Sequence, residues 1–282
     1  MSLRCGSRTL ELGRATYIMG IVNVTPDSFS DGGRFFSAVS AYERAMRLLE
    51  DGADLVDLGA ESTRPGAVPV PADEELRRLM PVLERLVAAG VDCLSVDTSK
   101  AAVAAAALDV GAAWINDVSG LADPDLARVA ARADALVVMH AQPMSAGRME
   151  DDVSYREVVN DVADHLAGLC ARAEAAGVRP DRLVVDPGIG FGKTVQDNLR
   201  LLEGAGELRR LGRPVLVGPS RKRFVGVLAG VDVADVDVDG RDQATVGACC
   251  LAALRGADLV RVHEVPAVRR ALAVIDAAVR PS

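Results

Sequence analysis

AYERAMRLLEDGADLVDLG, residues 41–59, contains one complete structural unit of this chain. Its first part, AYERAMRLLEDG, has the apolar spacing of an amphipathic helix, and its second part, DLVDLG, is a short apolar run that carries Asp57. The pentapeptide GADLV joins the two parts and recurs unchanged at 256–260. A Gly-Ala pair that ends a helix before an apolar strand is typical of the αβ half of a repeated unit.

Eight such apolar runs alternate with helical stretches along the chain. We predict strands at 17–23, 54–58, 92–97, 113–116, 135–139, 182–186, 214–217 and 258–262. We predict helices at 38–51, 73–89, 100–110, 123–132, 154–176, 196–211, 241–255 and 266–279. Alternating strands and helices indicate an α/β fold with a parallel sheet, and eight units in 282 residues fit a closed (β/α)8 TIM barrel. Because no low-complexity linker divides the chain, residues 1–282 are predicted to form a single domain.

Each predicted strand ends on, or leads into, polar or charged residues. These are Asn23, Asp57, Asp97, Asn116, Asp117, His140, Asp186, Ser220, Lys222, Arg261 and His263. Taken singly, such residues also serve as structural hydrogen-bond partners at a barrel rim. Together they indicate a site, because (β/α)8 barrels carry their reactive groups at the C-terminal ends of the strands. Long loops follow three of these strands, at 26–37, 61–72 and 141–153.

Composition restricts the classes of partner. The formal net charge is −8, the pI is about 5.0, and no run is rich in lysine or arginine. A general nucleic-acid binder usually has a basic face, so no nucleic-acid partner is expected. No apolar run approaches the roughly 18 residues of a membrane helix, so no membrane partner is expected either. The N-terminal residues lack the apolar core of a signal peptide, which predicts a cytoplasmic protein.

The cysteines are expected to be reduced thiols. Five is an odd number, and no CxxC spacing occurs among Cys5, Cys93, Cys170, Cys249 and Cys250. This pattern favours free cytosolic thiols over a disulfide framework or a zinc site.

DPGIGFGKT, residues 186–194, superficially resembles a phosphate-binding loop. A Walker A motif requires glycine where this chain has Pro187, so the match fails. One interpretation is an ordinary glycine-rich turn. The other is a ligand that lies flat against the backbone beside Asp186, since glycine permits close approach.

GPSRKRFVG, residues 218–226, places a serine and three cations directly after the seventh predicted strand. Loops after strands seven and eight of such barrels often bind phosphate. Arg261 and His263 are two residues apart on the last strand and therefore share one face. An anion site is favoured over a solvated basic patch.

The ordered set of motifs resembles the dihydropteroate synthase family of pterin-binding barrels. The matching pieces, between residues 18 and 264, are MGIVNVTPDSFSDGG, DLGAESTRPGA, SVDTSK, INDVSG, VVMH, DPGIGFGKT, GPSRKRF and VRVH. The resemblance implies a folate-pathway transferase that joins 4-aminobenzoate to 6-hydroxymethyl-7,8-dihydropterin diphosphate. The products would be 7,8-dihydropteroate and diphosphate. It also implies a homodimer and the class of enzyme that sulfonamides inhibit.

The same resemblance implies a role for each site residue. Mg²⁺ is the expected cofactor, with Asn23 as its ligand. The pterin would contact Asp97, Asn116, Asp186 and Lys222. The diphosphate would contact Asn23, Arg64, Arg261 and His263. The 4-aminobenzoate would contact Thr63, Pro65, Phe191, Ser220 and Lys222. Lys222, Arg261 and Asp97 are the expected catalytic residues, and catalysis would be mainly electrostatic because a polyanionic group leaves.

Two alternatives remain at this level. The related pterin-binding barrels of corrinoid-dependent methyltransferases bind methyltetrahydrofolate, but they have no need of the SRK and RVH cations. A paralogue that binds pterin without turnover is the second alternative, against which the intact Asn23, Lys222 and Arg261 argue. The chain departs from the family in MHAQPMSAGRME, residues 139–150, and in Arg241-Asp242-Gln243-Ala244-Thr245.

Overall fold

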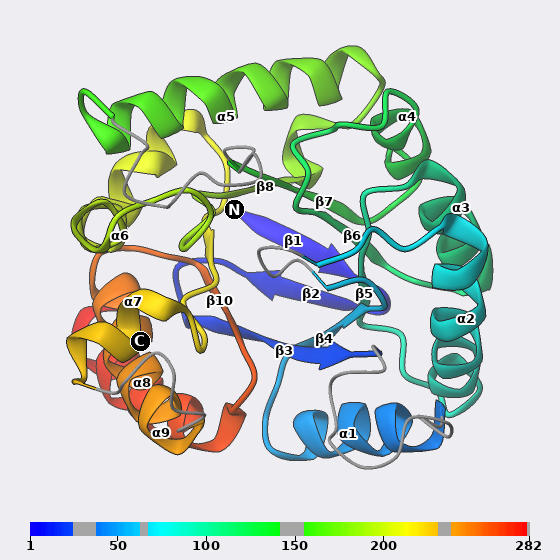
Figure 1. Ribbon diagram of the computed structural model, residues 1–282, viewed down its shortest axis with the longest axis horizontal. Coiled ribbons are helices and arrows are strands. Elements are labelled where there is room, and N and C mark those ends of the chain that lie inside the picture. Colours follow the sequence, from blue (N-terminus) through cyan, green and yellow to red (C-terminus); the bar gives the residue numbers. More distant parts are fainter. Residues whose placement is uncertain (25–37, 63–66, 142–154, 231–237, 281–282) are drawn as a thin grey trace.

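The chain folds into a barrel of eight parallel strands surrounded by helices (Figure 1). The computed structural model describes residues 1–24, 38–62, 67–141, 155–230 and 238–280. Hydrogen-bonded neighbours follow the order β8-β7-β6-β5-β4-β3-β10-β9. A parallel bridge between Val185 and Val215 joins β8 to the segment that enters β9, which closes the barrel. The predicted (β/α)8 architecture is confirmed.

The barrel strands lie where the apolar runs predict them. They are β3 (Tyr17–Asn23), β4 (Leu55–Gly59), β5 (Leu94–Asp97), β6 (Trp114–Asp117), β7 (Ala135–Met139), β8 (Leu183–Asp186), β9 (Leu216–Val217) and β10 (Leu259–Val262). The duplicated GADLV pieces lead into β4 and β10 and supply the first two residues of each strand. In both, the glycine has a positive φ, +100° at Gly52 and +97° at Gly256, which ends the preceding helix.

The outer helices also follow the prediction, with two differences. They are α1 (Ala38–Glu50), α2 (Ala72–Ala88), α3 (Ala101–Val110), α4 (Leu126–Ala130), α5 (Val158–Ala175), α6 (Val195–Glu203), α7 (Arg223–Leu228), α8 (Val238–Leu254) and α9 (Val265–Val279). The predicted helix 196–211 is interrupted after α6 and continues as a 3-10 helix, Ala205–Leu211. At Gly206 a β-carbon would lie 2.3 Å from the carbonyl oxygen of Arg255, so the chain packs too closely there for a larger residue. Helix α7 lies outside the predicted helical ranges.

Side chains inside the barrel form an apolar floor at the N-terminal ends of the strands. The floor includes Met19, Leu55, Trp114, Val184, Leu216 and Leu259, all fully buried. Outside the strands, the opposite faces pack against the helices in the larger core cluster. This two-layer burial follows from the alternation of side chains along a strand.

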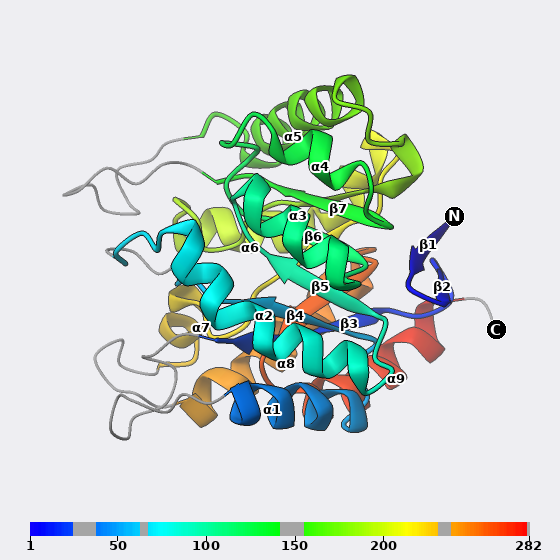
Figure 2. The ribbon, with the colours of Figure 1, turned by 90° about the vertical axis from the view of Figure 1, so that its right-hand side faces the viewer.

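An N-terminal hairpin that was not predicted covers this floor. Strands β1 (Ser2–Cys5) and β2 (Arg8–Glu11) pair antiparallel, and Figure 2 shows them at the end of the barrel where the strands begin. The indole nitrogen of Trp114 donates a hydrogen bond to the carbonyl oxygen of Arg4 at 2.7 Å. At the hairpin turn, the amide of Ser7 donates to a carboxylate oxygen of Asp92 at 2.7 Å. The hairpin therefore closes the end of the barrel opposite the predicted site.

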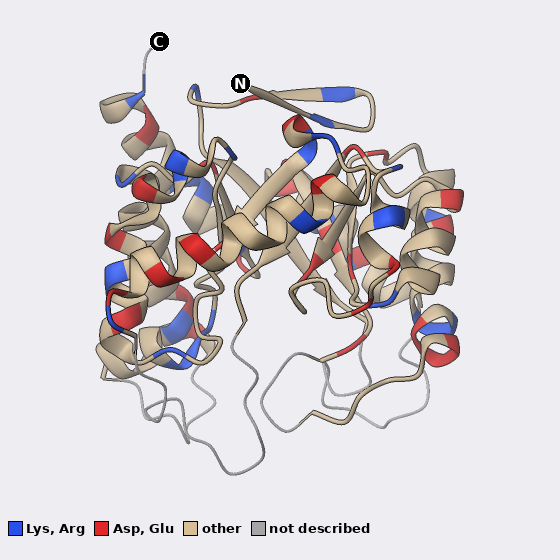
Figure 3. Cartoon of the chain, turned by 90° about the horizontal axis from the view of Figure 1, so that it is seen from above, with Lys and Arg blue, Asp and Glu red and all other residues tan. Residues whose placement is uncertain are grey.

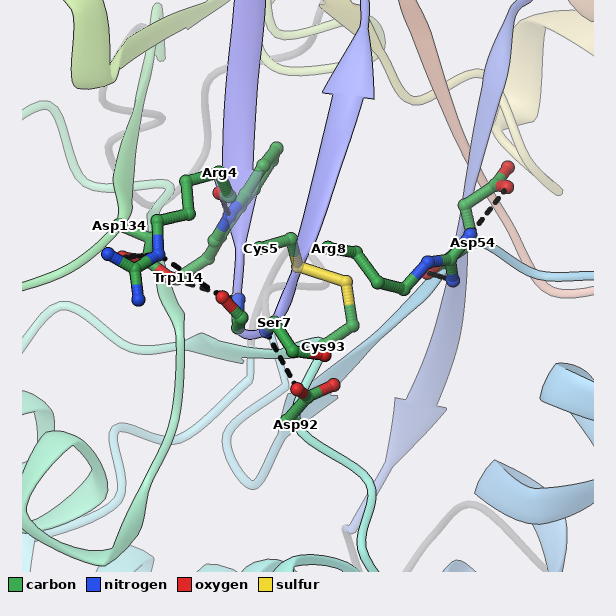
Figure 4. Close-up of a disulfide and its surroundings, with 10 residues drawn as sticks. Arg4, Cys5, Ser7, Arg8, Asp54, Asp92, Cys93, Trp114 and Asp134 are labelled. Carbon is green, nitrogen blue, oxygen red and sulfur yellow. Dashed lines mark hydrogen bonds and ion pairs between the residues drawn. A yellow bond between two sulfur atoms is a disulfide. The ribbon is translucent and has the colours of Figure 1, made fainter.

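The expectation that all five cysteines are free thiols is wrong for two of them. Cys5 and Cys93 form a disulfide between the hairpin and the chain entering β5 (Figure 4). Their separation of 88 residues gives no local signal, because the pairing depends on the hairpin crossing the barrel floor. Cys170, Cys249 and Cys250 are free.

The outer surface carries both signs of charge. Figure 3 shows acidic and basic residues interspersed over the outer helices in that view. Within the described ranges, no helix combines the length and apolar character needed to cross a membrane.

Candidate active site

Four polar side chains form a ring directly above the apolar floor. Asp57, Asn116, Asp186 and Arg261 each lie two residues after a floor residue of the same strand. Since side chains alternate along a strand, a residue two positions further on points the same way, into the barrel. We call these four residues the polar ring. These four of the strand-end residues thus converge at one level of the barrel, whereas Asp117 and His140 are bonded elsewhere, to Ser119 and Leu121 and to Lys193 respectively.

Arg261 is the centre of this ring. Its Nε donates to Asp57 Oδ2 at 2.6 Å, and its Nη2 donates to Asp97 Oδ2 at 2.8 Å. The fully buried Asp57 also accepts hydrogen bonds from Ser95 Oγ at 2.5 Å and from Asn116 Nδ2 at 2.9 Å. This network orients the guanidinium and the amide toward the mouth of the barrel.

Burial sets the protonation of the two carboxyls that border the mouth. Desolvation raises the pKa of Asp97 to about 7, against the attraction of Arg261, and the nearby Asp57 raises it further. Desolvation also raises the pKa of Asp186 to about 6. The Gly188 amide, which donates to Asp186 Oδ1 at 2.7 Å, lowers the Asp186 pKa, as do surrounding cations. Asp186 is therefore mainly a carboxylate at neutral pH.

A small pocket lies over the ring. It is lined by Asn116, Val118, Met139, Asp186, Ile189, Phe191, Gly218, Lys222 and Arg261. Three of the four residues predicted for the pterin line it, and the fourth, Asp97, is bonded to the lining residue Arg261. The combination of apolar walls with a few convergent polar groups is typical of small-molecule sites.

Lys222 and Phe191 form one wall of this pocket. The lysine Nζ lies 3.9 Å from the centroid of the phenyl ring, which is a cation–π contact. Gly190 has a φ of +81°, and a β-carbon there would lie 2.8 Å from Lys222 Cδ. Glycine at this position therefore lets the lysine cross the loop and reach the mouth.

The predicted anion side centres on His263. Ser220 Oγ accepts a hydrogen bond from the His263 amide at 3.1 Å and lies 2.9 Å from His263 Nδ1, so its hydroxyl is placed to donate to that nitrogen. His263 Nε2 lies 3.4 Å from Asn23 Nδ2. Arg44 Nη2 donates to the His263 carbonyl oxygen at 2.5 Å.

Cations surround His263 and keep it neutral. Burial lowers its pKa well below the usual value, and the charges of Arg221, Arg261, Lys222 and Arg44 lower it further. The imidazole is thus a neutral hydrogen-bonding group inside a cationic cluster. Arg221 is held by a bidentate ion pair with Asp242, at 2.8 and 2.7 Å. The segment Arg241-Asp242-Gln243-Ala244-Thr245 therefore fixes Arg221, one of the cations around His263.

The loop after β4 includes three of the predicted site residues. Thr63, Arg64 and Pro65 lie outside the described residues. The start of this loop is anchored by Glu61, whose Oε2 accepts from Lys100 Nζ at 2.5 Å and whose Oε1 accepts from the Val70 amide at 3.0 Å. Lys100 also donates to the fully buried Glu75 at 2.6 Å.

Lys193 is a buried residue of this region that no strand-end pattern indicates. Its side chain is fully buried behind residues 187–192, which we call the glycine loop, and burial lowers its pKa to about 7. Its Nζ lies 2.9 Å from Nδ1 of His140, whose pKa is lowered to about 3 by burial and by this lysine. The only available signal was a lysine inside a failed Walker A match.

The donor set near Asn23 fits one kind of metal site. Among the described residues, no group of three or more His, Cys, Asp or Glu side chains is arranged to hold a metal ion. Asn23, partly buried at the end of β3, supplies one amide oxygen. Mg²⁺ commonly takes one or two protein oxygens and completes its shell with water and substrate phosphates. The arrangement therefore fits a Mg²⁺ ion that arrives with a diphosphate.

Comparison with known proteins agrees with this geometry. The model of the family described as "Pterin binding enzyme" matches residues 19–263. Dihydropteroate synthase of Mycobacterium leprae is 49% identical over 264 residues, which is 92% of this chain and 92% of that protein. A Haloferax volcanii protein described as "Probable bifunctional folylpolyglutamate synthase/dihydropteroate synthase" is 48% identical over 255 residues. The chain spans 29% of that longer protein.

Solved structures lead to the same group. Xanthomonas albilineans dihydropteroate synthase with 4-aminobenzoic acid has a TM-score of 0.88 and 46% identity, covering 98% of both chains. Its complex with 7,8-dihydropteroate has a TM-score of 0.83 and 42% identity at the same coverage. The chain therefore belongs to the pterin-binding enzyme family. Within that family it belongs to the dihydropteroate synthases.

Proposed function

We propose that the chain condenses 6-hydroxymethyl-7,8-dihydropterin diphosphate with 4-aminobenzoate to give 7,8-dihydropteroate and diphosphate. The main observation behind this proposal is the mouth of the barrel. There a buried carboxylate, an amide and two cations, from Asp186, Asn116, Lys222 and Arg261, line one pocket. The complexes of the Xanthomonas albilineans enzyme with 4-aminobenzoic acid and with 7,8-dihydropteroate support this choice. They disfavour the methyltransferase alternative.

The pterin is placed against Asp186 and Asn116. A carboxylate accepts two parallel N–H donors, and the aminopyrimidine edge of a pterin offers such a pair. The Asn116 amide, held by Asp57, supplies a further hydrogen-bonding group. Asp97 acts indirectly in this proposal, because its carboxylate fixes Arg261.

Catalysis is mainly electrostatic. The C–O bond to the pterin methylene breaks with its electron pair on the departing diphosphate, while the electron-rich ring stabilises positive charge on carbon. Lys222 and Arg261 stabilise the developing negative charge from fixed positions, which is where preorganised cations act most strongly. The neutral aniline nitrogen then attacks the methylene carbon and releases its proton, so the reaction needs no strong base.

His263 and Asn23 bind the diphosphate side. His263 contributes hydrogen bonding, and the positive charge comes from the surrounding arginines and Lys222. Asn23 is proposed to ligate Mg²⁺, which neutralises part of the diphosphate charge when it is bound. Arg64 is proposed to contribute from the loop after β4.

The 4-aminobenzoate is placed beside Phe191 and Lys222, with Thr63 and Pro65 completing the site from their loop. Ser220 contacts His263 directly, so it links this subsite to the diphosphate side. Sulfonamides, which imitate 4-aminobenzoate, are expected to compete at this position. An inhibition curve with sulfamethoxazole at several 4-aminobenzoate concentrations measures that competition.

We also propose a cytoplasmic homodimer. Light scattering on a size-exclusion column measures the oligomeric state, and a monomer at micromolar concentration would contradict it.

The test of the reaction uses purified protein, pterin diphosphate, 4-aminobenzoate and Mg²⁺. Dihydropteroate and diphosphate are expected to appear in equal amounts and only when both substrates are present. Absence of product above the no-enzyme background would refute the proposed function.

A further inference from the structure

Lys193 is a buried basic residue whose partners belong to the glycine loop and to His140, the residue that follows β7. Its Nζ donates to the carbonyl oxygens of Gly188 at 2.9 Å and Phe191 at 3.0 Å, and it lies 2.9 Å from His140 Nδ1. An ammonium has three N–H donors, so these three partners can use all of them, and the His140 carbonyl oxygen is a longer fourth contact at 3.4 Å. Among the described residues Lys193 forms no ion pair, so backbone dipoles and the imidazole are its neighbours in place of a carboxylate.

This arrangement braces the glycine loop from the side facing away from the pocket. The Phe191 amide donates to Gly188 O at 3.1 Å, and the Gly190 amide donates to Asn198 Oδ1 at 2.7 Å. Gly188 has a φ of +67°, and a β-carbon there would lie 1.9 Å from the His140 carbonyl oxygen. The loop therefore lies directly on the backbone that follows β7.

The opposite side of the same loop forms the pocket wall. Ile189 and Phe191 line the pocket, and Asp186 precedes the loop and accepts its Gly188 amide. Lys193 thus holds two carbonyls whose neighbouring residues contact the pocket, although it does not line the pocket itself. Its positive charge also lowers the pKa of Asp186 and so favours the carboxylate.

Burying an ammonium without a carboxylate partner is unfavourable, because the desolvation penalty of a charge is large. Stability alone therefore gives no reason to keep a lysine here. We propose that Lys193 is the positioning residue of the pterin site, which fixes the glycine loop in the shape that presents Asp186 and Phe191 to the substrate. This inference rests on the proposed function.

The test is Lys193→Met in the full chain, since methionine has similar length and no N–H donors. A loop that is correctly shaped only part of the time reduces apparent affinity by that fraction. The pterin diphosphate KM is expected to rise about 10- to 100-fold, by analogy with the loss seen when a group that orients a metal ligand is removed. The kcat at saturation should change less than about threefold, because Lys222 and Arg261 are untouched.

Calorimetry separates positioning from general damage. The affinity for 6-hydroxymethyl-7,8-dihydropterin should fall by the same factor as KM rises, whereas the affinity for inorganic diphosphate with Mg²⁺ should stay unchanged. Arg269→Met is the matched control. Arg269 donates to the Gly52 carbonyl oxygen at 3.1 and 2.7 Å and also pairs with Asp54, so this variant removes a cation from a glycine turn remote from the mouth. It should lower the melting temperature without changing the pterin KM.

A pterin affinity loss smaller than tenfold in folded Lys193→Met would overturn the inference. An equal loss for pterin and diphosphate would also overturn it, since that pattern indicates general disruption of the mouth. If Lys193→Met does not fold, Lys193→Leu, which likewise has no N–H donors, is measured against the same criteria. An inactive wild type would instead refute the proposed function, so the two failures are distinguishable.

Discussion

Asp186→Asn tests the pterin site most directly. The substitution keeps an oxygen that accepts the Gly188 amide, a bond of 2.7 Å, so the glycine loop retains this contact. It replaces the other carboxylate oxygen by an NH₂ group, which meets a pterin N–H with like polarity. The change is therefore confined to charge and hydrogen bonding at one atom.

The expected magnitude follows from the contacts that are lost. A hydrogen bond to a charged group contributes about 1.5–3 kcal/mol, and the proposed pair of bonds loses at least one of them completely. Allowing for repulsion at the new amide, we expect a loss of about 3 kcal/mol, which is roughly 100-fold in the dissociation constant. The Asp186 pKa of about 6 leads to a second expectation, a pH dependence of pterin binding.

Because binding requires the carboxylate, wild-type affinity should fall as the pH drops through about 6, where Asp186 takes up its proton. The Asn variant has no such proton to gain, so the drop near pH 6 should be missing from its profile. The assay is calorimetry with 6-hydroxymethyl-7,8-dihydropterin from pH 5 to 8, with both proteins measured against the same ligand.

Asp117→Asn is the control for a buried strand-end carboxylate. Asp117 accepts hydrogen bonds from Ser119 and from the Leu121 amide and does not line the pocket. Its replacement should reduce stability while leaving pterin affinity intact. Equal pterin affinity in wild type and Asp186→Asn would refute the placement of the pterin against Asp186.

Two further predictions concern stability. Arg261→Met leaves Asp57 and Asp97 without their cation, and urea unfolding at pH 8 should show a loss of about 3–5 kcal/mol, the usual cost of removing one partner of a buried pair. The loss should shrink at pH 6, because Asp97, with a pKa already about 7, becomes neutral there; a loss independent of pH would contradict this reasoning. Cys5→Ser should lower the free energy of unfolding by about 3–5 kcal/mol under oxidising conditions, because the closed loop is long, and should leave kcat unchanged since the hairpin lies at the opposite end. Urea titrations with and without dithiothreitol check this, and equal stability of the oxidised wild type and the variant would count against it.

The prediction of the fold succeeded where the signal was local. Apolar runs of four to seven residues and the GADLV repeat identify the strands, and in both GADLV copies the glycine that ends the preceding helix adopts the expected positive φ. The hairpin at 2–11 was missed because its residues give no comparable pattern, and its place depends on Trp114, Asp92 and Cys93 from distant strands.

The candidate site was predictable as a set of residues but not as a set of contacts. Asn116, Asp186, Lys222 and Arg261 were all named from strand ends and family motifs, and they meet at one pocket. That Arg261 is held by Asp57 and Asp97, 204 and 164 residues away, could not be derived from spacing. Nor could the neutral state of His263, which depends on cations brought together from different elements.

The sequence by itself determined the alternation of strands and helices, the eight barrel strands and the end of the barrel that carries the site. These features are encoded locally, because the alternation of side chains along a strand and the glycine at a helix end each involve only a few neighbouring residues. Only the tertiary structure decided which carboxylate holds which cation, which two cysteines pair, and that Lys193 lies behind the pocket wall. Those outcomes depend on desolvation and on distances between atoms of remote segments, and both arise only when the barrel closes.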